Sequence, residues 1–169
     1  MKYKTIFFDL DGTITDSAPG IMNSIKYALE KNHLPMLSEE QLRSFIGPPL
    51  RGQFCKVCGL ADEESARMVE DYREYYRDKG IFENNVYDGV IEMLEKLRKK
   101  GFRLAIATSK PEKYAKIIID HFHLTKYFAC VAGMEMDGGR GTKAQVITYA
   151  LEKNDITDKS KVLMIGDRE

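Results

Sequence analysis

The chain has 169 residues, enough for one domain, or for one domain carrying an insertion, around a substantial hydrophobic core. Its 26 basic residues balance its 26 acidic residues, so no net charge favours nucleic acid, an anionic membrane surface or an acidic partner. The N-terminus is unlike a signal peptide and no apolar run is long enough to span a membrane. We therefore expect a cytoplasmic protein with no membrane or nucleic-acid partner.

The first predicted element is a strand at Thr5–Phe8, a continuous apolar and β-branched run typical of a strand buried on both faces of a parallel sheet. The pattern then changes, because residues 16–85 contain successive amphipathic helices and no further strand. Ser17 is expected to cap one of these helices and Asp62 another. We predict a helical bundle over residues 16–85, inserted between the first strand and the rest of the core.

The second half of the chain alternates helices with strands. A helical pattern begins at Val90 and stops at Gly101, and an apolar strand pattern follows at residues 103–107. A weaker strand run occupies residues 127–132, and the last one occupies residues 162–165. Strands that alternate with helices predict an α/β fold with a parallel sheet. Its core would be discontinuous in sequence, made of residues 1–15 and 86–169.

Two carboxylates follow the first strand directly. Asp9 and Asp11 are two positions apart, and Gly12 lets the chain turn so that both can face one cleft. Carboxylates so close repel one another unless a cation lies between them or one of them holds a proton. With Mg²⁺, which prefers oxygen ligands, one carboxylate can attack phosphorus while the other exchanges a proton with the leaving group.

Other strand ends carry groups that match this chemistry. Thr108 and Ser109 are expected to end the strand at residue 107 and to offer hydroxyl and N–H groups to a phosphate, just before a helix near Pro111. Lys143 begins an amphipathic helix from which its ammonium can reach a phosphoryl group. Asp167 follows the last strand and is a second candidate carboxylate for the metal.

These residues resemble the four ordered motifs of the haloacid dehalogenase superfamily. The motifs are Asp9-Leu10-Asp11-Gly12-Thr13, Thr108-Ser109, Lys143 and Gly166-Asp167. A helical insert directly after the first motif is similar to the cap of the phosphoglycolate phosphatase-like branch of that superfamily. The resemblance implies a Rossmann-like parallel sheet in three α/β/α layers, with a helical cap that closes over the cleft.

The resemblance also assigns roles to the site residues. It implies that Asp9 is the nucleophile that forms an aspartyl-phosphate and that Asp11 is the general acid and base. Asp9, Asp167 and the backbone carbonyl of Asp11 would hold Mg²⁺, while Thr108, Ser109 and Lys143 would bind the phosphoryl group. The implied activity is hydrolysis of a small phosphorylated metabolite by a monomer or weak dimer.

The substrate stays open at the level of sequence. Gly47 and Arg51 lie in and after a Gly-Pro-Pro loop of the insert, and both are candidates for contacting the non-phosphate end of a substrate. Phosphoglycolate is the first candidate substrate. A nucleoside monophosphate, as in a 5'-nucleotidase, is the second, and a β-phosphoglucomutase-like phosphotransfer is the third.

A non-enzymatic reading also stays open. The resembled family usually places a further aspartate four positions after the one matched by Asp167, followed by another strand and helices. The present sequence ends at Glu169, before those features. One alternative is therefore an inactive fragment with an exposed sheet edge, or a module that binds Mg²⁺ and phosphate without turnover.

Overall fold

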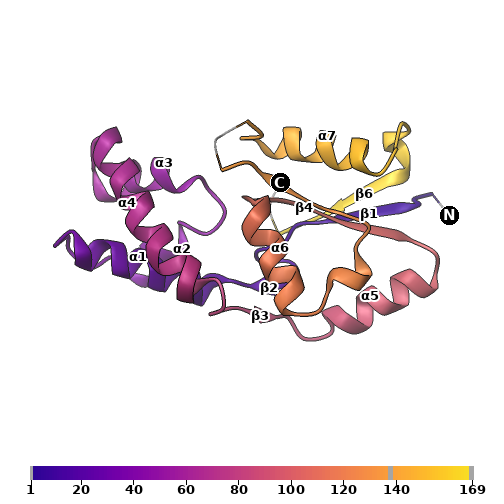
Figure 1. Cartoon of the computed structure of the whole chain (residues 1–169), viewed down its shortest axis with the longest axis horizontal. Coiled ribbons are helices and arrows are strands. Elements are labelled where there is room, and N and C mark those ends of the chain that lie inside the picture. The colour runs from indigo at the N-terminus through magenta and orange to yellow at the C-terminus, as the bar shows by residue number, and fades with distance from the viewer. Residues whose placement is uncertain (1, 137–138, 168–169) are drawn as a thin grey trace. The chain divides into compact units, whose positions relative to one another are not determined.

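The computed structural model describes residues 2–136 and 139–167 (Figure 1). The chain divides into two compact units. The α/β unit comprises Met1–Asp16 and Val86–Glu169, and the helical unit comprises Ser17–Asn85. The boundary lies one residue after the predicted one, since Asp16 belongs to the α/β unit.

The α/β unit is built on a four-stranded sheet. Its strands are β1 (Thr5–Phe8), β4 (Arg103–Pro111), β5 (Val131–Met134) and β6 (Val162–Ile165), arranged in the order β5-β4-β1-β6. All three neighbouring pairs are parallel, with Thr5 opposite both Arg103 and Val162. All four residues of β1 are buried, which fits its place inside the sheet. The predicted parallel α/β fold is confirmed.

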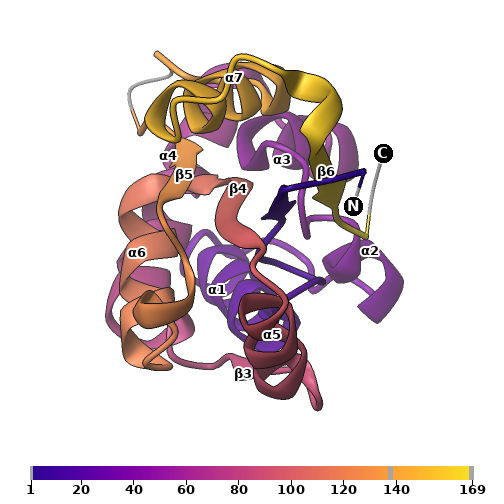
Figure 2. The ribbon, with the colours of Figure 1, turned by 90° about the vertical axis from the view of Figure 1, so that its right-hand side faces the viewer.

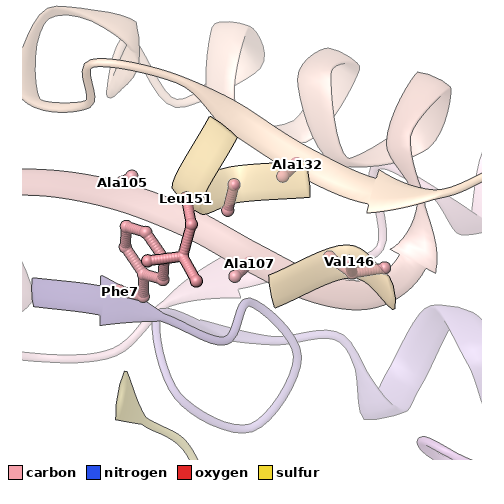
Figure 3. Close-up of a cluster of buried hydrophobic side chains, with 7 residues drawn as sticks. Phe7, Ala105, Ala107, Ala132, Val146 and Leu151 are labelled. Carbon is pink, nitrogen blue, oxygen red and sulfur yellow. The ribbon is translucent and has the colours of Figure 1, made fainter. Parts of the chain in front are cut away.

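Helices cover both faces of this sheet. α7 (Lys143–Lys153) lies on one face, and α5 (Val90–Lys99) and α6 (Glu112–His121) lie on the other (Figures 1 and 2). Figure 3 shows a buried cluster in which α7 packs on the sheet. Small residues on the strands let the helix approach closely, while bulky side chains fill the space between the layers. The cluster contains Phe7, Ala105, Ala107, Ala132, Val146, Ala150 and Leu151.

Two strand boundaries differ from those predicted. β4 continues four residues past the predicted end to Pro111, because its last residues still pair with β5, where Pro111 lies opposite Met134. The strand predicted at residues 127–132 begins only at Val131, and Thr125–Tyr127 form a short 3-10 turn. The apolar pattern was misleading here, since Tyr127 is buried without belonging to a strand.

The helical unit contains four α-helices and one π-helical turn among the described residues. These are α1 (Ala18–Lys31), α2 (Glu39–Arg43), α3 (Leu50–Cys58), α4 (Asp62–Tyr75) and the π-helical turn Tyr76–Gly80. The rings of Phe45 and Phe54 meet edge to face at 4.9 Å, and those of Tyr72 and Tyr76 stack at 5.3 Å. Aromatic packing of this kind gives the bundle its interior. No helix in the described part of the chain is long and apolar enough to cross a membrane.

The two predicted helix caps are not made by the expected side chains. Ser17 occupies the N-cap position of α1, but its hydroxyl forms no capping hydrogen bond. The N-cap residue of α4 is Ala61 rather than Asp62. The Asp62 carboxylate instead accepts a hydrogen bond from Arg51, with Arg51 Nε 2.7 Å from Asp62 Oδ1.

Two further short strands, β2 (Thr15–Asp16) and β3 (Asn85–Val86), form a separate two-stranded sheet.

Candidate active site

The loop after β1 presents the two predicted carboxylates at the carboxyl edge of the sheet. Asp9 donates its backbone N–H to the Ile165 carbonyl of the neighbouring strand at 2.8 Å. The carbonyl of Leu10 then accepts backbone N–H groups from three successive residues, the nearest of them Ile14 at 2.9 Å. This network closes a tight turn around Asp11 and Gly12. Because the backbone is held so firmly, the positions of both carboxylates are set by the end of a buried strand.

Gly12 is required at this turn for two reasons. Its φ is +77°, a left-handed conformation that side chains with a Cβ rarely adopt. In addition, a Cβ at this position would lie 2.5 Å from Oδ2 of Asp167, so the Asp167 carboxylate would have to move away from the turn. The carboxylate of Asp167 therefore packs directly against the turn that carries Asp9 and Asp11. The first and fourth predicted motifs meet in space.

Asp9 forms an ion pair with the first residue of α7. The ammonium of Lys143 donates to Asp9 Oδ2, and the other carboxylate oxygen, Oδ1, accepts the backbone N–H of Leu10 at 2.8 Å. The helix is capped by Thr142, whose hydroxyl accepts from the Gln145 N–H, so the position of Lys143 is well determined. A cation at a helix N-terminus is electrostatically unfavourable, and the Asp9 carboxylate offsets that cost.

Asp11 forms an ion pair with a different lysine, one that the sequence reasoning did not single out. Nζ of Lys110 lies 3.0 Å from Oδ1 and 2.9 Å from Oδ2 of Asp11. The Lys110 side chain is only 6% exposed and that of Asp11 is 15% exposed. The available signal was a lysine directly after the Thr108-Ser109 pair, near the end of a strand that is buried from Leu104 to Thr108.

The hydroxyl pair lies inside β4 and not beyond its end as predicted. Thr108 is 1% exposed, and its Oγ1 accepts the backbone N–H of Lys110 at 3.2 Å. Ser109 is half-buried. The prediction of a strand end at residue 107 was wrong because the chain stays extended through Pro111 to pair with β5. The phosphate-binding role of the two hydroxyls stays a prediction.

Tyr87 is a further residue of this region that the sequence did not indicate. Its backbone N–H donates to the carbonyl of Ile14 in the turn after β1, at 3.2 Å. Burial raises the pKa of the Tyr87 phenol, and the negative charges of Asp16, Asp167 and Asp11 raise it further. Its hydroxyl therefore remains protonated at neutral pH and can act only as a neutral donor or acceptor.

The two predicted specificity residues lie in the helical unit. Gly47 is in the loop between α2 and α3, with φ at +100°, and is exposed. Arg51 is in the first turn of α3, and its guanidinium is paired with Asp62. A substrate carboxylate would have to compete with Asp62 for Arg51. The specificity role of both residues stays a prediction.

The residues at the sheet edge suit a hard divalent cation. The predicted ligands, namely the side chains of Asp9 and Asp167 with the carbonyl of Asp11, are all oxygen donors, the type that Mg²⁺ prefers. Because Gly12 has no Cβ, the Asp167 carboxylate can lie next to the turn that carries Asp9 and Asp11. Within residues 2–136 and 139–167, no group of three or more His, Cys, Asp or Glu side chains forms a metal cluster. The proposed set needs only two side chains, so it fits that result.

Comparison with known families agrees with this fold and site. The family model for haloacid dehalogenase-like hydrolases matches residues 6–169, which is nearly the whole chain. A solved structure, that of a predicted phosphatase from Clostridium acetobutylicum, superposes with a TM-score of 0.92 at 42% identity. It covers 99% of this chain, and this chain covers 77% of it. The chain therefore belongs to the haloacid dehalogenase-like hydrolase family, and its homologues identify it as a phosphatase.

Curated relatives carry several different names. A 5'-nucleotidase of Pseudomonas aeruginosa is 39% identical over 99% of this chain and 76% of its own length. The tyrosine-protein kinase PtkA of Mycobacterium tuberculosis is 37% identical over 96% of this chain, which spans 55% of that kinase. A phosphoglycolate phosphatase of Vibrio parahaemolyticus is 30% identical over 97% of this chain and 75% of its own length. These names share phosphoryl chemistry and differ in the substrate.

Proposed function

We propose that the protein is a Mg²⁺-dependent phosphomonoester hydrolase that acts through an aspartyl-phosphate on Asp9. The observation that carries the proposal is the pairing at the end of β1, where two carboxylates two positions apart bind two different lysines. That arrangement gives chemically similar groups different surroundings, as a nucleophile and an acid-base catalyst require. Their placement at the carboxyl edge of a parallel sheet, where ligands bind in such folds, supports the same proposal.

In the first step, a carboxylate oxygen of Asp9 forms a bond to phosphorus and the bond from phosphorus to the ester oxygen breaks. The carboxyl group of Asp11 gives its proton to the departing oxygen, so the product leaves as an alcohol. Lys143 lies at Asp9 and stabilises the negative charge that develops on the phosphoryl oxygens. Asp9 then carries the phosphoryl group.

In the second step, Asp11 takes a proton from a water molecule whose oxygen attacks phosphorus. The bond between phosphorus and Asp9 breaks, which releases inorganic phosphate and restores the free carboxylate. The side chains of Asp9 and Asp167 and the carbonyl of Asp11 would hold Mg²⁺. The bound ion would supply positive charge that lets an anionic carboxylate approach an anionic phosphate.

The proposal extends to the helical unit and the substrate. An insert directly after the nucleophile motif can exclude water from the cleft and contact the leaving group, so it is the part of the chain that would select substrates. Of the two phosphatase names among the relatives, 5'-nucleotidase comes with the higher identity. Nucleoside 5'-monophosphates are therefore the first substrates to test, and phosphoglycolate is the second.

The decisive experiment measures phosphate release by the purified chain, with and without Mg²⁺. The panel contains nucleoside 5'-monophosphates, phosphoglycolate, hexose phosphates and p-nitrophenyl phosphate. We expect release that needs Mg²⁺ and disappears in Asp9→Asn, while Lys113→Met, which alters an exposed lysine of α6, behaves as the wild type. Release that persists in Asp9→Asn would remove Asp9 as the nucleophile.

A second candidate is phosphotransfer to an acceptor other than water. It is supported by the relative that is named a tyrosine-protein kinase. The same aspartyl-phosphate would serve, with an acceptor hydroxyl in place of water in the second step. Adding glucose or a tyrosine peptide to the phosphatase assay separates the two candidates, because a transferase would make a new phosphate ester at the expense of free phosphate.

A further inference from the structure

We propose that Lys110 is a positioning residue that holds the side chain of Asp11 in place for proton transfer. The inference rests on the proposed function, because it explains how Asp11 is kept apart from the chemistry of Asp9. It concerns a lysine outside the motif residues on which the family resemblance depends. The argument comes from its contacts, its burial and the local shape of β4.

The contact between the two residues uses every acceptor atom of the carboxylate. Nζ of Lys110 lies within 3.0 Å of both oxygens of Asp11, so the ammonium fixes the rotation of the carboxylate as well as its position. A charge-assisted hydrogen bond of this kind is stronger than a neutral one. The ammonium of Lys110, near the end of β4, therefore fixes the carboxylate in the turn after β1.

The burial of Lys110 makes this contact persistent. A lysine side chain that is only 6% exposed has left most of its water, so losing its carboxylate would strand a buried charge. An exposed ion pair can separate because water replaces each partner, whereas little water can reach Lys110. Asp11 is therefore held in one orientation before any substrate arrives.

The end of β4 is shaped to aim Lys110 at the turn after β1. The pairing register between β4 and β5 shifts between Ala107 and Pro111, an irregularity of the kind that re-aims side chains beside active sites. The hydroxyl of Thr108 accepts the backbone N–H of Lys110. On the adjacent strand, Gly133 passes so close that a Cβ there would lie 2.6 Å from the Lys110 carbonyl oxygen. The backbone that carries the lysine is thus fixed from two sides.

Each of the two neighbouring aspartates therefore has a lysine of its own. Lys143 binds Asp9 and Lys110 binds Asp11, from different elements of the fold. Without Lys110, the Asp11 carboxylate would be free to turn within a loop that also carries Asp9 and against which Asp167 packs. It could then compete for the metal or point away from the leaving group. With Lys110 bound to both carboxylate oxygens, the backbone carbonyl of Asp11 would be left to hold Mg²⁺ and the side chain would be kept for proton transfer.

The first test separates the two chemical steps with p-nitrophenyl phosphate, whose leaving group needs little protonation. In Lys110→Met we expect a normal burst of p-nitrophenol followed by turnover slowed about 10- to 100-fold, with KM changed less than about threefold. Asp11→Asn should show the same burst and stall. Lys110→Arg should recover part of the rate, and the exposed control Lys113→Met should match the wild type. A Lys110→Met enzyme with wild-type steady-state turnover would overturn the inference.

The second test does not depend on activity. A crystal structure of Lys110→Met should show the Asp11 carboxylate rotated or spread over several rotamers, while Asp9 keeps its position. An Asp11 carboxylate that stays in place in that variant would refute the positioning role, whether or not the wild type hydrolyses phosphate esters. If the wild type releases no phosphate, the proposed function fails and this structure still decides the inference. If Lys110→Met does not fold, Lys110→Gln takes its place in both tests.

Discussion

The ion pairs of the candidate active site differ in sequence separation and exposure from those between α1 and α4 of the helical unit. At the strand ends of the α/β unit, Lys110 binds Asp11 across 99 positions of sequence and Lys143 binds Asp9 across 134. Lys110 is 6% exposed. On the helical unit, Lys31 of α1 binds Asp71 and Glu74 of α4, but it is 42% exposed. Lys143 is 32% exposed, so the pair that the protein encloses is Lys110–Asp11. The pair of Lys31 with Glu74 lies largely in solvent, while Asp71 is 19% exposed.

The difference in exposure indicates which charged groups are candidates for a catalytic role. Removing lysine and aspartate from water is costly, and such pairs rarely improve stability over apolar residues of the same size. Charges that remain enclosed at the ends of parallel strands are therefore candidates for function. Pairs in solvent are screened and contribute little. The predictions below test this contrast, from the largest expected effect to the smallest.

The largest effect should come from the nucleophile. Asp9→Asn should lower turnover by at least about 10⁴-fold, because replacing a nucleophile removes the covalent pathway. Labelling with a ³²P-phosphate ester and acid quenching should capture a phosphoprotein in the wild type and none in the variant. A labelled Asp9→Asn chain would mean that another group attacks phosphorus.

Replacing the acid-base residue should cost less than replacing the nucleophile. Asp11→Asn should slow turnover about 10²- to 10⁴-fold, because both proton transfers lose their donor and acceptor. The same acid-quench measurement should still capture the phosphoprotein, now at a higher steady-state level. An unchanged rate in Asp11→Asn would reassign the acid to another residue.

Loss of the fourth-motif carboxylate should act on the metal. Losing a group that only supports a metal ligand costs about 10- to 100-fold in affinity, and Asp167→Ala should raise the Mg²⁺ concentration for half-maximal activity at least as much. A titration of activity against Mg²⁺ measures this change. Glu152→Ala, at an exposed site of α7, is the matched control. Identical Mg²⁺ dependence in Asp167→Ala and the wild type would place the metal elsewhere.

The smallest effect should come from the exposed pair on the helical unit. Burial raises the pKa of Asp71, but hydrogen bonds from Lys31 and Asn32 outweigh it and lower that pKa below 3.8. The hydrogen bonds that Lys31 donates to Asp71 and Glu74 raise the pKa of Lys31 above 10.5. A carboxyl group whose pKa is lowered by folding stabilises the fold at pH values above its ordinary pKa. An amine whose pKa is raised by folding stabilises it at pH values below its ordinary pKa. The contribution is therefore complete between these two values, and it is lost as pH falls through the lowered Asp71 pKa.

Thermal unfolding of Asp71→Asn measures that contribution. At pH 7 the free energy of unfolding should fall by less than about 1 kcal/mol, as for other pairs near solvent. The difference from the wild type should shrink as the pH is lowered below 3.8. Glu30→Gln, at an exposed position of α1, is the control. A loss of several kcal/mol would mean that this pair behaves like the enclosed ones.

Much of the site could be predicted from sequence because it depends on local signals. Apolar runs mark β1 and β6, and the polar residues directly after them are Asp9, Asp11 and Asp167. The carboxyl ends of parallel strands meet at one edge, so residues far apart in sequence could be expected to converge. The structure brings Asp9 together with Lys143, and it packs Asp167 against the turn that carries Asp11.

Other features depend on contacts that no local pattern encodes. The strand carrying Thr108 runs on to Pro111 only because a neighbouring strand pairs with it. Arg51 looks like a free guanidinium in sequence, but Asp62 lies beside it in the folded helical unit. Residue type and spacing cannot reveal such partners, because they are chosen by packing between elements.

The sequence by itself determined the parallel α/β fold, the helical insert and the residues that stand where the strands end, since periodicity and turn chemistry act over a few neighbouring positions. Only the tertiary structure decided which lysine meets which aspartate. Lys110 reaches Asp11 because β4 pairs directly with β1 and its end is irregular. Enclosure by the surrounding fold then makes that contact persistent, and so tertiary packing gives two neighbouring aspartates different surroundings.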